Sequence, residues 1–143
     1  MIRPLALVWM GIVIGVSFLA TPVKFTADSL TRPVALDVGR ATFHALAYLE
    51  WVLAALLAVL IWRTAMHQQS IGRRALTAAA VVVVAVVVQS AWLQPELDER
   101  VASIIAGIEP PPSHLHTVYG IVEVTKVVAL GLLAAWADPQ PRR

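Results

Sequence analysis

The sequence contains no cysteine. This absence excludes disulfide bonds, thiolate metal sites, iron–sulfur clusters and covalently attached c-type haem. Charged residues are also scarce, because Asp, Glu, Lys and Arg make up 14% of the chain, against roughly 25% in soluble domains. Together with a content of 59% hydrophobic residues, this scarcity indicates that lipid is the main solvent of the protein.

Signatures of enzymes and of nucleic-acid binding are missing as well. The net charge of +2 is small, and no run of Lys or Arg is interleaved with aromatic residues, so the sequence gives no support for a nucleic-acid partner. It contains no G-x-S-x-G, H-E-x-x-H, Walker-type phosphate loop or dinucleotide fingerprint. We therefore identify no catalytic residue and favour a non-enzymatic role. An enzyme built from scattered polar residues stays open.

Four long apolar segments lie between the charged stretches. A helix needs about 20 predominantly apolar residues to cross a hydrocarbon core of ~30 Å. The segments that meet this requirement run from about 5 to 21, 41 to 62, 75 to 93 and 118 to 137. The 143 residues are therefore predicted to form a single all-α domain, an integral membrane four-helix bundle.

The first apolar segment has two further features. It follows Arg3 as in a secretory signal peptide, but cleavage after Ala20 would leave the bulky Phe18 where a small residue is expected, so we predict that the segment is retained. Gly11 and Gly15 form a GxxxG pattern, which lets a second helix backbone approach closely. We favour packing of these glycines inside the bundle, with packing in a homo-oligomer as the alternative.

The distribution of positive charge predicts the orientation. Lys and Arg are retained on the cytoplasmic side of short loops. The six cationic residues of the termini and the second loop are Arg3, Arg63, Arg73, Arg74, Arg142 and Arg143, and the four on the opposite side are Lys24, Arg32, Arg40 and Arg100. We expect a multi-pass protein of the plasma (inner) membrane with both termini cytoplasmic. Trp9, Trp62, Trp92 and Trp136 lie towards the ends of spans and are interpreted as interfacial anchors.

The segments outside the spans carry signals for helix boundaries. Thr31 and Pro33 suit a helix start, so the second helix is expected to begin near them. Between Pro95 and Gly107, apolar residues recur at helical spacing, which predicts a short interfacial helix in the second outer loop. These residues are Leu97, Val101, Ile104, Ile105 and Ile108.

Three ionisable residues, Glu50, Glu123 and Lys126, lie inside the predicted spans. Such residues cost a few kcal/mol each by insertion scales, so they face the bundle interior and find partners. Glu50 in the second span and Lys126 in the fourth each lie about 14 Å from the outer ends of their helices, estimated from the helical rise. We predict that they meet. The pair either fixes the helix register or takes part in a proton or ion relay, and both roles stay open.

The fourth span carries a polar face. At about 100° per residue, His116, Tyr119, Glu123 and Lys126 fall within about 80° of one another. Gln89, near the outer end of the third span, is positioned to join them. We predict an outer polar cluster made of Glu50, Glu123, Lys126, His116, Tyr119 and Gln89. A face of this kind also occurs where polar groups only hydrogen-bond between helices.

The histidines allow alternatives with a cofactor. His44 and His116 start at similar outer depths on two helices, which is the minimum for bis-histidine ligation of a b-type haem. His114 and His116, preceded by Glu109, also offer imidazole and carboxylate ligands to a divalent metal such as zinc or copper(II). Ordinary interfacial histidines are favoured over both, so the cofactor stays unknown.

Two stretches carry a resemblance to known proteins. The first lies within 8–40 and contains Ala20-Thr-Pro-Val-Lys-Phe25 and Leu36-Asp-Val-Gly-Arg40. The second lies within 93–126 and contains Pro95-Glu-Leu-Asp-Glu-Arg100, Pro112-Ser-His-Leu-His116 and Glu123-Val-Thr-Lys126. The sequence resembles a family of small uncharacterised four-span bacterial membrane proteins. This implies a four-helix bundle with one side of functional interest, and supplies no activity.

A more distant likeness is to the membrane copper-resistance D proteins. The chain has no Cys and three Met residues, so it offers few soft ligands for copper(I). From the sequence we expect a binding or accessory membrane protein that handles a small ion, a proton or a polar ligand in the outer cluster. A haem or metal protein and a structural subunit of a larger membrane complex are the alternatives.

Overall fold

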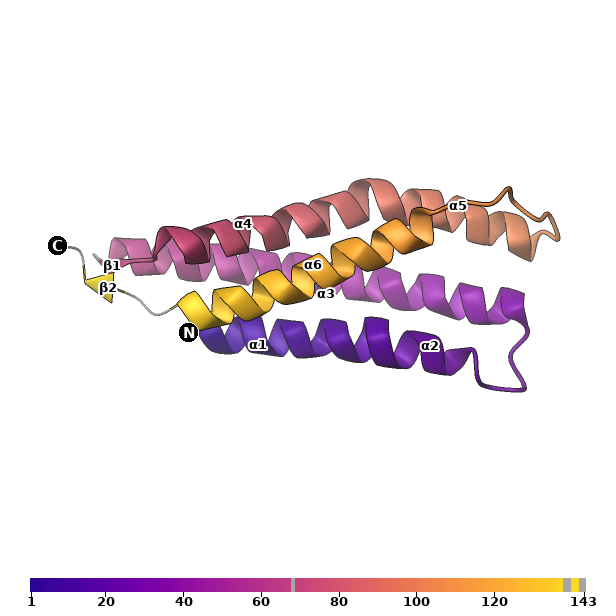
Figure 1. Ribbon diagram of the computed structural model, residues 1–143, viewed down its shortest axis with the longest axis horizontal. Coiled ribbons are helices and arrows are strands. Elements are labelled where there is room, and N and C mark those ends of the chain that lie inside the picture. Colours follow the sequence, from indigo (N-terminus) through magenta and orange to yellow (C-terminus); the bar gives the residue numbers. More distant parts are fainter. Residues whose placement is uncertain (68, 138–139, 142–143) are drawn as a thin grey trace.

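The computed structural model describes residues 1–67, 69–137 and 140–141. Its main elements are four helical rods that run side by side along one long axis (Figure 1). Each rod is long and apolar enough to cross a membrane, and the four segments are Ile2–Lys24, Arg32–Met66, Arg73–Ile105 and Leu115–Trp136. The all-α architecture predicted from the apolar segments is thereby confirmed.

The first two rods extend beyond the apolar segments that predicted them. The first consists of α1 (Ile2–Val13), the π-helical turn η1 (Ile14–Ala20) and α2 (Thr21–Lys24). The second is a single helix, α3 (Arg32–Met66), with Thr31 as its N-cap residue. The expected helix start is confirmed there, because Pro33 has no backbone N–H to leave unsatisfied in the first turn.

The third rod is longer than its predicted span. It runs without interruption through α4 (Arg73–Val88), the π-helical turn η2 (Gln89–Leu93) and α5 (Gln94–Ile105). The helix expected between Pro95 and Gly107 is thus present, but it continues the third span end to end. Ile105 and Ile108 are exposed, whereas Leu97, Val101 and Ile104 face a cavity inside the bundle.

Each π-helical turn lies just before a proline. A proline has no N–H for the carbonyl four residues earlier, and its ring clashes with that carbonyl. Thr21, which precedes Pro22, donates its N–H to Val16 O, and Gln94, which precedes Pro95, donates its N–H to Gln89 O. Both bonds span five residues, which is the spacing of a π-helix. The widened turn lets the rod continue through the proline.

The last rod is α6 (Leu115–Trp136), which begins after the N-cap residue His114. The Ser113 hydroxyl accepts a hydrogen bond from the N–H of Leu115 at 3.1 Å, which satisfies one backbone donor at the start of the helix. Helix α6 packs mainly against α1 and α4, whereas α3 packs against α1, α4 and α5. Consequently α3 and α6 are not main packing neighbours.

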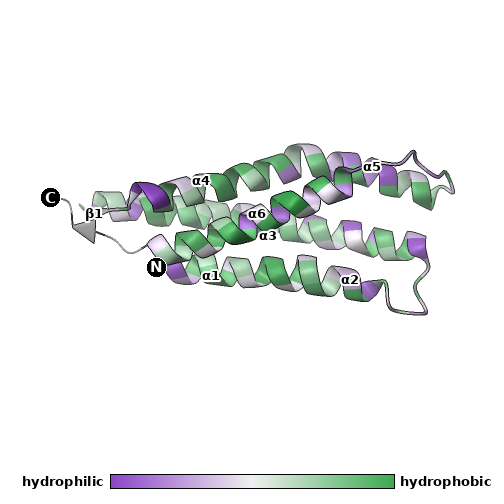
Figure 2. Cartoon of the chain, in the orientation of Figure 1, coloured by the Kyte–Doolittle hydropathy of each residue, from purple (hydrophilic) through white to green (hydrophobic). Residues whose placement is uncertain are grey.

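The end of the bundle near Met1 holds a continuous apolar core. Buried side chains of α1, α3, α4 and α6 form it, including Val13, Leu57, Val82 and Leu130. Hydrophobic colour runs along all four rods, whereas hydrophilic colour gathers at the ends and in short bands within helices (Figure 2). Met1 and the end of α6 lie at the same end of the bundle (Figure 1). There β1 (Gln69–Ser70) pairs antiparallel with β2 (Gln140–Pro141).

The GxxxG pattern does not pack inside the bundle as predicted. A Cβ atom added at Gly11 or Gly15 would meet no atom of another residue in the described part of the chain within 4 Å. Gly11 is exposed and Gly15 half-buried. The helices that flank α1 contact it along a different face, so packing of these glycines in a homo-oligomer stays a prediction.

Candidate functional site: a buried polar network and two cavities

Lys126 lies at the centre of a polar network inside the bundle. Its ammonium group is 2.6 Å from Glu50 Oε1 and 2.8 Å from Glu123 Oε2, and it donates a hydrogen bond of 2.6 Å to Gln89 Oε1. The Lys126 side chain has 0% exposure. A lysine ammonium has three N–H donors and no acceptor. Three neighbouring residues therefore satisfy it completely, from α3, η2 and α6 itself.

Glu50 reaches this ammonium from α3. Its other contact is the Trp9 indole, whose Nε1–H donates to Glu50 Oε1 at 2.9 Å. Trp9 is 1% exposed, so the interpretation of Trp9 as an interfacial anchor was wrong. A buried indole N–H needs an acceptor, and the carboxylate supplies it. Trp62, Trp92 and Trp136 are exposed, with 62%, 52% and 39% of their surface accessible.

Glu123 is held by both π-helical turns. Ser17 in η1 donates its hydroxyl to Glu123 Oε1 at 2.5 Å, and Gln89 in η2 donates its amide to Glu123 Oε2 at 2.5 Å. The Glu123 residue is 1% exposed. π-Helical turns recur at functional sites because they displace side chains from their α-helical positions. Here the two turns aim their polar groups at one carboxyl.

The network contains one more carboxyl group than ammonium groups. Glu50, Glu123 and Lys126 are all buried, at 3%, 1% and 0% exposure. All four carboxyl oxygens have at least one hydrogen-bonding or ionic partner, and these partners come from the first, third and fourth rods. If both carboxyls were ionised, a net charge of −1 would be enclosed in a region of low dielectric. An uncompensated buried charge is strongly unfavourable.

A cavity of about 300 Å³ lies at the loop end of the bundle. Its wall includes the charged side chains of Lys24, Arg32, Arg40, Asp98 and Arg100. Apolar and aromatic residues form much of the rest, namely Phe25, Leu36, Phe43, Leu97, Val101 and Ile104. The site residues His116 and Tyr119 also line it, and the ring of Phe43 meets that of Tyr119 edge to face, with centroids 5.2 Å apart.

The inner wall of this cavity adjoins the buried network. Thr21 and Tyr119, which line the cavity, are each four residues from a network residue, Ser17 and Glu123 respectively. Four residues make about one helical turn, which is about 5.4 Å of rise. Two residues of the cavity wall therefore lie about one turn of helix from Ser17 and Glu123.

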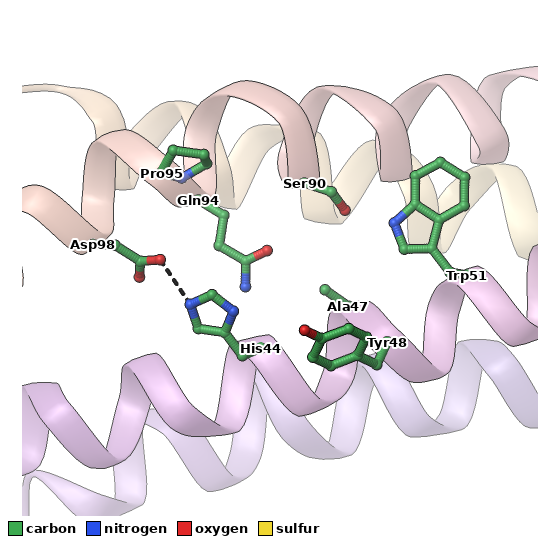
Figure 3. Close-up of a pocket in the computed structure, with 8 residues that line it drawn as sticks. All are labelled: His44, Ala47, Tyr48, Trp51, Ser90, Gln94, Pro95 and Asp98. Atoms are coloured by element: carbon green, nitrogen blue, oxygen red, sulfur yellow. Dashed lines mark hydrogen bonds and ion pairs between the residues drawn. The ribbon is translucent and has the colours of Figure 1, made fainter.

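A second cavity of about 160 Å³ lies between α3 and the η2–α5 segment. Figure 3 shows His44, Tyr48 and Trp51 on α3 facing Gln94 and Asp98 across it. His44 Nε2 is 2.7 Å from Asp98 Oδ2. Gln94 is 7% exposed, and its Nε2 has no hydrogen-bond partner among the described residues. Gln94 and Asp98 line both cavities.

The histidines predicted as metal or haem ligands lie apart from the network. His44 lines the smaller cavity and His116 the larger, and both side chains are exposed. His114 is the N-cap residue of α6. Within residues 1–67, 69–137 and 140–141, no group of three or more His, Cys, Asp or Glu side chains is placed to hold a metal ion. An optical spectrum of the purified protein would test the haem alternative.

The structure brings together four of the six residues of the predicted cluster, Glu50, Gln89, Glu123 and Lys126. His116 and Tyr119 face the larger cavity instead. The sequence reasoning missed Trp9, Ser17 and Gln94. Ser17 lies five residues before Pro22 and Gln89 lies six before Pro95, so a proline just after a predicted span was the available signal for a displaced polar side chain.

The comparisons with known proteins identify the family and no activity. No curated protein matches the chain, and neither does a solved structure. The family described as "Domain of unknown function (DUF4149)" matches residues 5–103, which include nearly all of the first three rods and the polar residues Ser17, Glu50 and Gln89. Since the match covers more than half of the 143 residues, the chain belongs to the DUF4149 family.

Proposed function

We propose that the protein is a proton-binding accessory protein of the membrane, and that the Glu50–Lys126–Glu123 network holds one exchangeable proton. The observation that carries the proposal is the surplus carboxyl: two carboxyl groups and one ammonium group are buried together. A bound proton makes the network neutral. Neutrality removes the large cost of enclosing a net charge in hydrocarbon.

The hydrogen-bond donors favour Glu123 over Glu50 as the carboxyl that holds this proton. Glu50 receives hydrogen bonds from the Trp9 indole and the Lys126 ammonium, and neither group can accept one in return. Glu123 Oε1 instead contacts the Ser17 hydroxyl, which can donate or accept. A protonated Glu123 Oε1 can therefore donate a hydrogen bond to Ser17 Oγ. The same contact serves the ionised carboxylate when the hydroxyl rotates.

The larger cavity supplies the route for exchange. Its wall residues Tyr119 and Thr21 lie about one helical turn from Glu123 and Ser17, respectively. Water in this cavity would pass a proton to the network from the loop end of the bundle. At the opposite end, the apolar side chains of the core cluster exclude water from the network.

Infrared spectroscopy of the protein in detergent or lipid tests this function. A protonated carboxyl has a C=O absorption that an ionised carboxylate lacks, and hydrogen bonding shifts it. We expect one such band in the wild type, absent in Glu123→Gln and displaced in Ser17→Ala. Trp9→Phe is the matched control, because Trp9 contacts Glu50, and it should leave the band in place. A wild-type spectrum without the band, or a band unchanged by Ser17→Ala, would contradict the assignment.

We further propose that the protein lies in a bacterial inner membrane with both termini cytoplasmic and the two cavities on the outer side. The positive charges at Arg3, Arg63, Arg73 and Arg74 support this orientation. A reporter enzyme fused after Arg143 should then be cytoplasmic, and an epitope tag inserted between Glu99 and Glu109 should be accessible from outside. An external fusion at Arg143 would reverse the direction of proton access.

A further inference from the structure

We propose that the larger cavity binds the anionic head of an amphiphile, a carboxylate or phosphate group attached to an apolar chain. The proposal goes beyond proton binding and uses none of the residues of the buried network. Basic pockets between transmembrane helices bind the head groups of anionic lipids. The argument here rests on the unpaired cations, on the fit of Lys24 and on the apolar wall.

Two cations on the cavity wall keep no anionic partner. Arg32 forms an ion pair with Glu109 at 3.2 Å, and Arg40 forms one with Asp37 at 2.6 Å. Lys24 forms no ion pair with any described residue. Arg100 donates a hydrogen bond of 2.6 Å to the neutral carbonyl of Pro111.

The one carboxylate among the described lining residues does not neutralise them. Asp98 lies 2.7 Å from His44 on the side of the smaller cavity. The charge of Lys24 and of Arg100 is therefore available to a ligand.

The position of Lys24 depends on a glycine. Gly39 of α3 is buried, and a Cβ at this position would overlap the Lys24 ammonium. The side chain of Lys24 thus crosses from the first rod onto the backbone of α3, where both residues line the cavity. Any larger residue at position 39 would displace the ammonium. Because Gly39 has no side chain, the Lys24 ammonium can lie inside the cavity wall.

The remaining wall suits an apolar chain rather than a free ion. Leu36, Phe43, Leu97, Val101 and Ile104 line the cavity together with the cations. The volume of about 300 Å³ is at the lower end for pockets that enclose small organic ligands. It takes a head group and the first part of a chain. Apolar burial and charge pairing would then act on the same ligand.

Native mass spectrometry of the purified full-length chain tests the proposal. The probes are oleate, phosphatidylglycerol, phosphatidylcholine and inorganic phosphate. We expect oleate or phosphatidylglycerol to bind more tightly than phosphatidylcholine, and which of the two binds identifies the source of the head group. Inorganic phosphate alone should bind weakly. Equal binding of the two phospholipids would overturn the proposal, and so would full competition by inorganic phosphate, because the apolar wall would then contribute nothing.

Variants locate the site on the bundle. Lys24→Gln and Arg100→Gln should each weaken binding of the preferred amphiphile by roughly tenfold, the loss expected for one charge-assisted hydrogen bond. Arg74→Gln, which removes a cation from the opposite end of the bundle, is the matched control and should have no effect. Gly39→Ala removes no charge and increases helix propensity, so it should fold while still weakening binding. If neither the single variant Gly39→Ala nor the single variant Lys24→Gln weakened binding, the proposed position of the binding site would be overturned.

These outcomes are separable from those for proton binding. The infrared band of Glu123 should persist in Lys24→Gln and Arg100→Gln, since neither residue contacts the network. Conversely, Glu123→Gln should retain amphiphile binding. Loss of one property with retention of the other would therefore show which of the two proposals fails.

Discussion

The two ends of this bundle are built from the same four rods in different ways. At the end near the chain termini, apolar side chains such as Leu57, Leu130 and Leu133 fill the centre. Towards the long loops, the centre holds an ammonium, two carboxyls and an amide, and beyond them a cavity with a charged wall. Lipid cannot replace the partners of the polar groups, whereas it solvates apolar side chains as well as a neighbouring helix does. The polar half should therefore depend more strongly on single residues.

The largest expected effect is at Lys126. Lys126→Met leaves two buried carboxyls facing each other, and removal of one partner from a buried pair typically costs ~3–5 kcal/mol. Thermal or denaturant unfolding in detergent would measure the loss. The double change Glu50→Gln with Lys126→Met should recover most of it, because the remaining Glu123 is neutral when protonated.

A second double variant sharpens this comparison. Glu123→Gln with Lys126→Met leaves Glu50 beside the Trp9 indole, which cannot accept a hydrogen bond from a protonated carboxyl, so it should recover less stability. Equal recovery by the two doubles would argue against the assignment of the proton to Glu123. If the losses in unfolding free energy of the single variants simply add in the double variants, the charged side chains are not coupled.

The apolar half should respond less. Leu130 has 0% exposure, and Leu130→Ala creates a cavity that costs about 2 kcal/mol, at the lower end of the range for buried leucines because lipid supplies no hydrophobic drive between helices. Val84→Ala serves as the control, since Val84 is 60% exposed and its change should be close to neutral. A loss at Leu130 as large as that of Lys126→Met would erase the proposed difference between the halves.

Trp9 belongs to both halves, because it packs in the apolar core and donates to Glu50. Trp9→Phe keeps most of the apolar bulk and removes the indole N–H. We expect a loss of about 1–2 kcal/mol from the broken hydrogen bond, measured by the same unfolding experiment. If Trp9→Leu, which also removes the aromatic ring, costs no more than Trp9→Phe, then the hydrogen bond and not the packing accounts for the role of Trp9.

The smallest effect is expected at the outward-facing glycines. Gly11→Ala and Gly15→Ala introduce a Cβ that meets nothing within 4 Å in the described chain, and alanine stabilises a helix interior by up to about 1 kcal/mol relative to glycine. Each variant should unfold at a slightly higher temperature. A lower one, accompanied by a change in oligomeric state on gel filtration, would reveal a second copy packed on this face.

The sequence predicted the architecture well for a simple physical reason. Four apolar segments of sufficient length have few ways to cross a membrane, since every backbone group must be bonded within a helix. The meeting of Glu50 and Lys126 was also accessible, because their equal depth follows from helical rise alone. The contact of Ser17 with Glu123 was not, since it depends on how the π-helical turn η1 rotates Ser17. The cavity could not be predicted from the sequence either, because Lys24 and Gly39 meet only through the packing of the first rod on α3.

The turn η2 changes the phase of the third rod. Continued from Val82 at about 100° per residue, the buried stripe would place Glu96 about 40° from its centre and Asp98 about 160° away. The structure shows the reverse, because Glu96 is exposed while Asp98 is half-buried and contacts His44. The π-helical turn thus offsets the two parts of the rod by about one residue. The buried faces of α4 and α5 are therefore rotated relative to each other about the axis of the rod. Asp98 faces the cavities because of this rotation.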